Sequence, residues 1–121
     1  MAMIEKAERD EAQINLAMTV RILDGLTEEN LLVLLMGRAE TQWGEALDKH
    51  VTFCTKLGED PSEGAHEEWA SAITKLFYEC YYEVEKKLEA IRVANESRKQ
   101  GSFLPILLTC LGMNHGPEHH Y

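Results

Sequence analysis

The chain has 121 residues, of which 45% are hydrophobic, a size that allows one domain with a single core. Its 21 acidic residues outnumber its 12 basic residues, and the formal net charge is −9. Because a strongly acidic surface repels phosphate, we do not expect direct binding of nucleic acid.

Cysteine usage and hydropathy favour a cytoplasmic protein. Cys54, Cys80 and Cys110 are far apart, odd in number and set in apolar helical contexts, which is not a disulfide framework and indicates a reducing compartment. The first residues of the chain are rich in charge, unlike a signal peptide. The longest apolar run, 103–113, is about half the length of a membrane span, so we expect no membrane association.

The first predicted helix covers residues 3–24, with Gly25 as the residue that ends it. One apolar stripe at helical spacing consists of Ile4, Ala7, Ile14, Met18 and Ile22. A second stripe, on another side, consists of Leu16, Val20 and Leu23. We therefore expect this helix to be covered on more than one side.

The second predicted helix opens at Thr27, whose hydroxyl can accept a hydrogen bond from a free backbone amide, and ends at Leu57. Its apolar stripe contains Leu32, Met36, Ala39, Trp43, Leu47, His50, Cys54 and Leu57. Gly37 and Gly44 share one face and weaken the helix. Close backbone packing at both glycines, or a kink at Gly37 that splits the helix, would explain them.

Residues 58–61 predict a tight turn into a third helix. Asp60 is the expected N-cap, Pro61 the first helical residue and Glu63 the return arm of a capping box. The third helix carries the stripe Trp69, Ile73, Leu76, Cys80, Val84, Leu88 and Ile91, and nothing interrupts it before Gly101.

A short hydrophobic helix is predicted over 103–111, capped by Ser102. It has no polar face, so it either closes the open end of the helix pair or docks on a second subunit or a target protein. Residues 114–121 form a polar tail. The predicted organisation is thus a single helical domain, 1–113, followed by the tail, 114–121.

Together these elements predict an all-α fold. It consists of a long antiparallel αα-hairpin, an N-terminal helix and a short hydrophobic C-terminal helix. One hairpin cannot cover this much apolar surface, so we expect a homodimer in which two hairpins complete a helical bundle.

Candidate partner-binding residues gather on the third helix and after it. Tyr78 and Tyr82 are neighbours on one face, where aromatic side chains are either buried within the chain or anchor an interface. Acidic side chains at the start of the third helix suit the helix dipole and could also grip a basic partner. The predicted partner-binding set is Tyr78, Tyr82, Phe103, Leu104, Leu107, Glu67 and Glu68.

The histidines favour structural roles over a cofactor site. His50 interrupts an apolar stripe and is expected to be a hydrogen-bonded core residue. Glu63 and His66 have the spacing used in di-metal bundles, but those sites need a second such pair and two more carboxylates. In the tail, His115, His119 and His120 could share a metal ion. A polar tail without metal is the simpler interpretation, and no cofactor is expected.

No catalytic constellation occurs in the sequence, so we predict that the protein is not an enzyme. The predicted function is that of a small acidic regulatory protein that binds a protein partner and inhibits or sequesters it. Antiactivators and anti-defence proteins are similar in size and charge. The alternatives are a nucleic-acid mimic that blocks a DNA- or RNA-binding enzyme, and a helical bundle that binds a metal or a small ligand.

Overall fold

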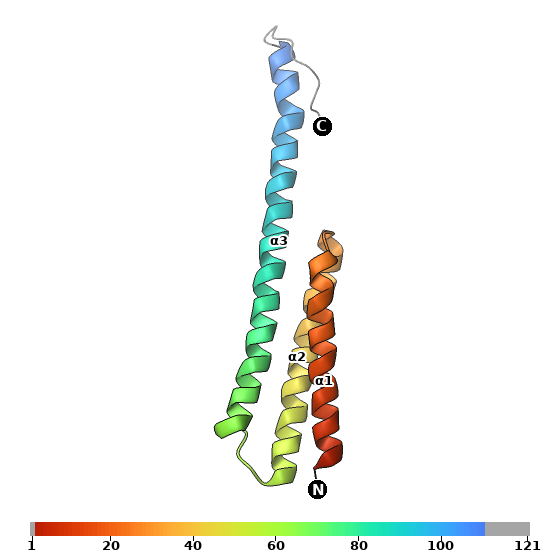
Figure 1. Ribbon diagram of the computed structural model, residues 1–121. Coiled ribbons are helices and arrows are strands. Elements are labelled where there is room, and N and C mark those ends of the chain that lie inside the picture. The colour runs from red at the N-terminus through yellow and green to blue at the C-terminus, as the bar shows by residue number, and fades with distance from the viewer. Residues whose placement is uncertain (1, 111–121) are drawn as a thin grey trace. The chain divides into compact units, whose positions relative to one another are not determined.

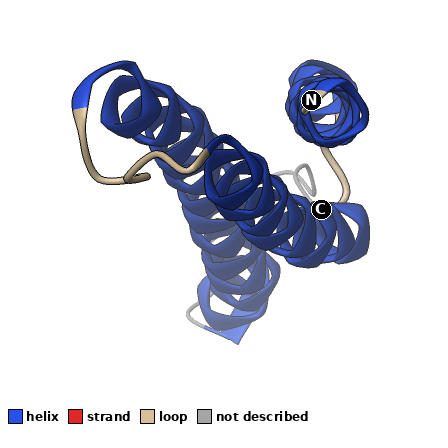
Figure 2. Cartoon of the chain, turned by 90° about the horizontal axis from the view of Figure 1, so that it is seen from below, coloured by secondary structure: helices blue, strands red, loops and turns tan. Residues whose placement is uncertain are grey.

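The computed structural model describes the backbone of residues 2–110 and the side chains of residues 2–98. The described residues form α1 (Met3–Ile22), the short 3₁₀ helix η1 (Leu23–Gly25), α2 (Glu29–Leu57) and α3 (Gly64–Cys110) (Figure 1). Figure 2 shows helices and loops but no strand in this part of the chain. The all-α prediction is confirmed. The chain divides into two units, Met1–Glu85 and Lys86–Tyr121, which are described separately.

Three helices pack together in the first unit. α2 runs antiparallel to α1 and to the part of α3 that belongs to this unit (Figure 1). Its contact with α3 centres on Trp43, whose ring stacks on Phe77 at 4.5 Å between centroids and whose Nε1 donates to Thr74 Oγ1 at 3.2 Å. The buried apolar side chains on these two helices are Leu32, Leu35, Ala39, Ala46, Phe53, Cys54, Ile73, Phe77, Cys80 and Val84.

The two apolar stripes expected on α1 differ in burial, so the expected cover on more than one side is not found within the described residues. Ile14 and Met18 are each 56% exposed, and Ile4 and Ile22 are exposed as well. The face that packs contains Leu16 and Leu23 of the second expected stripe, together with Arg9, Ala12 and Thr19. Both stripes have helical spacing, and only the second one brings Leu16 fully into the core.

The connection between α1 and α2 also differs from the prediction. η1 takes up Leu23–Gly25, and α2 begins at Glu29 after extended backbone at Leu26 and Glu28. No side chain caps this helix start, so the predicted role of Thr27 is wrong. Among the described glycines a positive φ occurs at Gly58 and Gly64, so Gly25 is not a left-handed cap.

The turn between α2 and α3 depends on two left-handed glycines. Gly58, with φ 73°, ends α2, and its amide donates to the Thr55 carbonyl while the Glu59 amide donates to the Cys54 carbonyl. Asp60 accepts hydrogen bonds from the Ser62 amide and hydroxyl, so it closes a local turn. α3 therefore begins at Gly64 with φ 56°, and the predicted capping box at Asp60 and Glu63 is wrong.

Gly37 and Gly44 neither split α2 nor allow a close approach. α2 is one helix across both positions, and a Cβ atom added at either glycine would have no neighbour within 4 Å. Both expected explanations for these glycines are therefore unsupported.

Replacing either helical glycine should stabilise the protein. We expect Gly37→Ala and Gly44→Ala each to raise the free energy of unfolding by about 0.5–1 kcal/mol, because alanine has less backbone entropy to lose. Chemical denaturation measures the change. Gly58→Ala is the matched control and should destabilise by about 1 kcal/mol, because its left-handed backbone disfavours a Cβ atom. Destabilisation by either helical substitution would contradict the absence of neighbours.

The second unit contains the remainder of α3. The helix continues through Gly101 to Cys110, so the predicted break and the separate helix over 103–111 are wrong. Arg92 pairs with Glu89 and Glu96 along the exposed helix surface, an arrangement worth little stability. The boundary predicted at residue 113 and the tail 114–121 lie outside the described residues. None of the helices in the described range has the length and hydropathy needed to cross a membrane.

Candidate functional site

A polar cluster lies inside the first unit, among α1, α2 and the start of α3. Arg9 is the residue that α1 contributes to this cluster, and its side chain is 9% exposed. The guanidinium carbon lies 4.8 Å from the centre of the Phe53 ring and 4.7 Å from that of Trp69. Such cation–π contacts stabilise a desolvated guanidinium. Asp10 accepts from Arg9 Nε and Nη2, which partly balances the charge.

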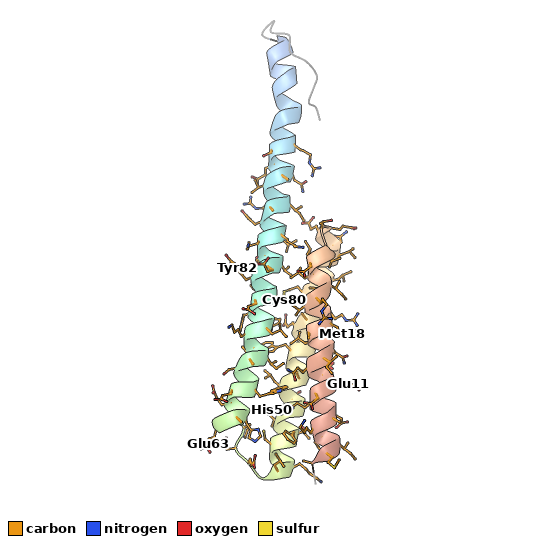
Figure 3. All side chains as sticks on the ribbon, viewed as in Figure 1. Glu11, Met18, His50, Glu63, Cys80 and Tyr82 are labelled. Carbon is orange, nitrogen blue, oxygen red and sulfur yellow. The ribbon has the colours of Figure 1, made fainter. Side chains whose placement is uncertain are left out.

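His50 is the centre of the cluster and joins all three helices. It is 1% exposed, stacks on Trp69 at 4.4 Å between centroids, and points from α2 toward the start of α3 (Figure 3). Arg9 Nη1 lies 3.3 Å from His50 Nδ1, and the His66 carbonyl oxygen lies 3.1 Å from His50 Nε2. Since arginine can only donate, Nδ1 accepts and Nε2–H donates. The prediction of a hydrogen-bonded core histidine is confirmed.

Burial keeps His50 neutral. Its pKa is lowered chiefly because a charged ring would lose its hydration, and the nearby Arg9 charge acts in the same direction. A neutral imidazole is also the form that Arg9 requires as an acceptor. His50 is therefore suited to hold the helices together or to act as a ligand.

Cys54 lies one helical turn after His50 and is completely buried. Its Sγ atom is 3.6 Å from His50 Nε2. Burial raises the pKa of the thiol, so Cys54 is not an activated nucleophile. Cys80 is also buried, and burial raises its pKa in the same way.

His66 connects the buried cluster to solvent. Its Nε2 atom donates to the Glu59 carboxylate, and its ring lies 5.2 Å from that of His50 between centroids. An open cavity of about 560 Å³ lies beside it, lined by Gly58, Glu59, Asp60, Glu63, Gly64, Ala65 and His66. Three acidic residues, Glu59, Asp60 and Glu63, thus line the cavity beside His66.

A second candidate site is the exposed apolar face of α1. Ile14, Met18 and Ile22 follow one another at four-residue spacing, and all three are more than half exposed. Ile22 also borders a hollow of about 220 Å³ with Leu31 and Leu34 of α2. This surface, here called the α1 face, consists of Ile14, Met18, Ile22, Leu31 and Leu34.

The predicted tyrosines lie on another surface. Tyr78 and Tyr82 are 55% and 63% exposed, and Tyr82 projects from α3 away from α2 (Figure 3). Tyr78 makes an edge contact with Trp43 and lines an open groove of about 540 Å³ that also contains Leu47, Glu67 and Thr74. The structure therefore brings Tyr78 and Glu67 into one groove.

Glu68, the remaining predicted partner-binding residue with a described side chain, does not line this groove. Glu67 and Glu68 are exposed, and Glu67 accepts a hydrogen bond from Ser71. The side chains of Phe103, Leu104 and Leu107 lie outside the described residues, as do the three tail histidines His115, His119 and His120.

Sequence reasoning missed Arg9 as part of a site. Its position relative to Ala12 and Leu16 was an available signal, because the three residues share a helical face. Comparisons with protein-family models, with curated proteins and with solved structures found no match.

Proposed function

We propose that this protein acts by binding other protein chains and sequestering a protein target. The observation that supports this proposal most strongly is the α1 face, on which three large aliphatic side chains stand in a row beside an apolar hollow. Contiguous exposed apolar surface is costly in water and marks interaction sites.

The proposed occupant of the α1 face is a second copy of the chain. Ile14, Met18 and Ile22 form a straight row along a helix, and two such rows related by a two-fold axis would complement each other. The homodimer completes the bundle by covering α1, rather than by pairing the tyrosine surfaces.

Sedimentation tests the dimer. We expect the wild-type protein to be dimeric at micromolar concentration and Met18→Glu to be monomeric, because the buried carboxylate would have no partner. Val51→Glu is the matched control, since Val51 is 48% exposed and lies outside the α1 face. It should leave the dimer intact. A wild-type protein that stays monomeric at high micromolar concentration would contradict the proposal for this face.

The proposed contact with the sequestered target is the groove that contains Tyr78. Tyrosine offers a large apolar ring with a hydroxyl that remains hydrated, a combination enriched in interface centres. Affinity capture from the native host followed by mass spectrometry identifies the target, and titration of purified variants then tests the groove.

Tyr78→Ala with Tyr82→Ala should weaken target binding severely. Anchoring aromatics are worth ~2 kcal/mol or more, which is about 30-fold in affinity. The comparison variant is Glu67→Lys with Glu68→Lys. We expect it to weaken target binding only slightly, because each exposed charge is worth ~0–1 kcal/mol. If the charge reversal instead weakens target binding strongly and the tyrosine substitutions leave it unchanged, the result would support nucleic-acid mimicry. Target binding that weakens steeply with rising salt concentration would support the same alternative.

A further inference from the structure

We propose that His50, Cys54 and His66 form a binding site for a zinc-like divalent cation. Each of the three residues offers one ligand atom, and these atoms all lie within 4.8 Å of one another. Two imidazoles and a thiolate are the donors that zinc prefers. This site goes beyond protein binding and does not depend on it.

One of the distances between ligand atoms already suits tetrahedral coordination, and the others, which lie within 4.8 Å, would shorten as the metal binds. Bonds of about 2.0 Å to nitrogen and about 2.3 Å to sulfur place the nitrogen and sulfur ligands of a tetrahedron about 3.5 Å apart. His50 Nε2 and Cys54 Sγ are already 3.6 Å apart. Because these two residues lie one turn apart on α2, the helix itself fixes this edge of the site.

Glu59 acts as a positioning residue for His66. Its carboxylate accepts from His66 Nε2, which leaves Nδ1 of the neutral ring with a lone pair for the metal. Carboxylates that hold the distal nitrogen of a ligating histidine are a regular part of zinc sites. The rings of Phe53 and Trp69 lie against His50, which is 1% exposed, and limit the access of water to it.

The open cavity beside His66 gives a metal ion access to the proposed site from solvent. Its lining includes the acidic residues Glu59, Asp60 and Glu63 together with His66. Clustered negative charge concentrates cations at such an opening. Water from this cavity would complete the coordination of the metal.

Metal binding requires two protons to move. Cys54 binds as the thiolate, so its thiol proton leaves to solvent as the sulfur–metal bond forms. The His50 proton transfers from Nε2 to Nδ1, and Nδ1 can then no longer accept from Arg9. Arg9 gives up that 3.3 Å hydrogen bond but keeps Asp10 and the two aromatic rings as partners. The His66 carbonyl likewise gives up the 3.1 Å hydrogen bond from His50 Nε2, because that nitrogen now binds the metal.

The parent protein for the test is the full chain with His115, His119 and His120 replaced by alanine, which removes the imidazoles of the tail. Titration with cobalt(II), followed by displacement with zinc, reports both stoichiometry and ligand type. We expect one cobalt per chain with a thiolate-to-cobalt charge-transfer band. Circular dichroism on each variant establishes that the helices have formed.

Removal of a ligand should weaken binding strongly. We expect Cys54→Ser to abolish the charge-transfer band and His66→Ala to weaken zinc binding by more than about 100-fold, while Glu59→Gln weakens it by about 10–100-fold. Cys80→Ser is the matched control, because Cys80 is an equally buried cysteine outside the proposed ligand set, and it should bind as the parent does.

Three outcomes would overturn the site. They are a parent protein without the charge-transfer band, a folded Cys54→Ser variant with unchanged affinity, and binding that the wild-type chain shows but the parent lacks. The last of these would assign the metal to the tail.

Discussion

Leu16→Ala is expected to lower the free energy of unfolding by about 2–5 kcal/mol. Leu16 is completely buried on the face of α1 that packs in the core, so truncation removes apolar contact and leaves a cavity. The shift of the urea midpoint measures the loss.

Ile14→Ala is the matched comparison for this substitution. Ile14 lies two residues away on the same helix but is more than half exposed, so its truncation should change stability by less than about 1 kcal/mol. Both substitutions are best made in the Met18→Glu background, which separates folding from self-association. A larger loss from Ile14 than from Leu16 would mean that α1 packs through the stripe that contains Ile14.

Trp69→Ala is expected to destabilise the protein by about 3–5 kcal/mol, the usual cost of truncating a packed tryptophan. Its ring stacks on His50 and covers one side of the Arg9 guanidinium, so the substitution removes packing and leaves a buried cation with less cover. Thermal and urea denaturation measure the loss.

Two further substitutions bracket this result. Trp43→Ala should lower the free energy of unfolding by a similar amount, because it removes the stack on Phe77 and the hydrogen bond to Thr74. Tyr82→Ala, at a 63% exposed aromatic, should have little effect on folding. Unchanged urea midpoints for both tryptophan variants would show that the packed faces of α2 and α3 are assigned wrongly.

Local signals predict much of α2 and α3. A single apolar stripe identifies the buried face of each helix, as Ala39 and Cys54 show on α2 and Ile73 and Val84 show on α3. Gly58 ends α2 where its apolar stripe ends. Periodicity identifies these buried positions, although α2 also carries exposed apolar residues outside the stripe, such as Leu31 and Leu34.

The buried face of α1 could not be predicted from the apolar pattern in the same way. It offers two apolar stripes, and the choice between them depends on the surface presented by α2 and α3. The selected face also carries Arg9, whose burial is tolerated only because Phe53, Trp69 and His50 surround it. These partners are distant in sequence, so no local pattern around Arg9 identifies them.

The start of α3 shows a second limit. Asp60, Pro61 and Glu63 have the composition of a capping box. The Asp60 carboxylate nevertheless accepts hydrogen bonds from Ser62, and α3 begins only at Gly64. This three-residue shift places the His66 carbonyl at His50 Nε2. The candidate site thus depends on a competition between turns that composition does not resolve.

The placement of the two tryptophans gives the first unit a pair of internal fluorescent probes. Trp43 contacts α3 residues, whereas Trp69 contacts Arg9 of α1 as well as His50 of α2. Emission from a Trp43→Phe variant therefore reports whether α1 is seated, and emission from a Trp69→Phe variant reports whether α2 and α3 are joined. Unfolding curves that coincide for the two variants would show that α1 leaves only when the whole unit melts. Separate curves would show that α1 can detach while the remaining two helices stay paired.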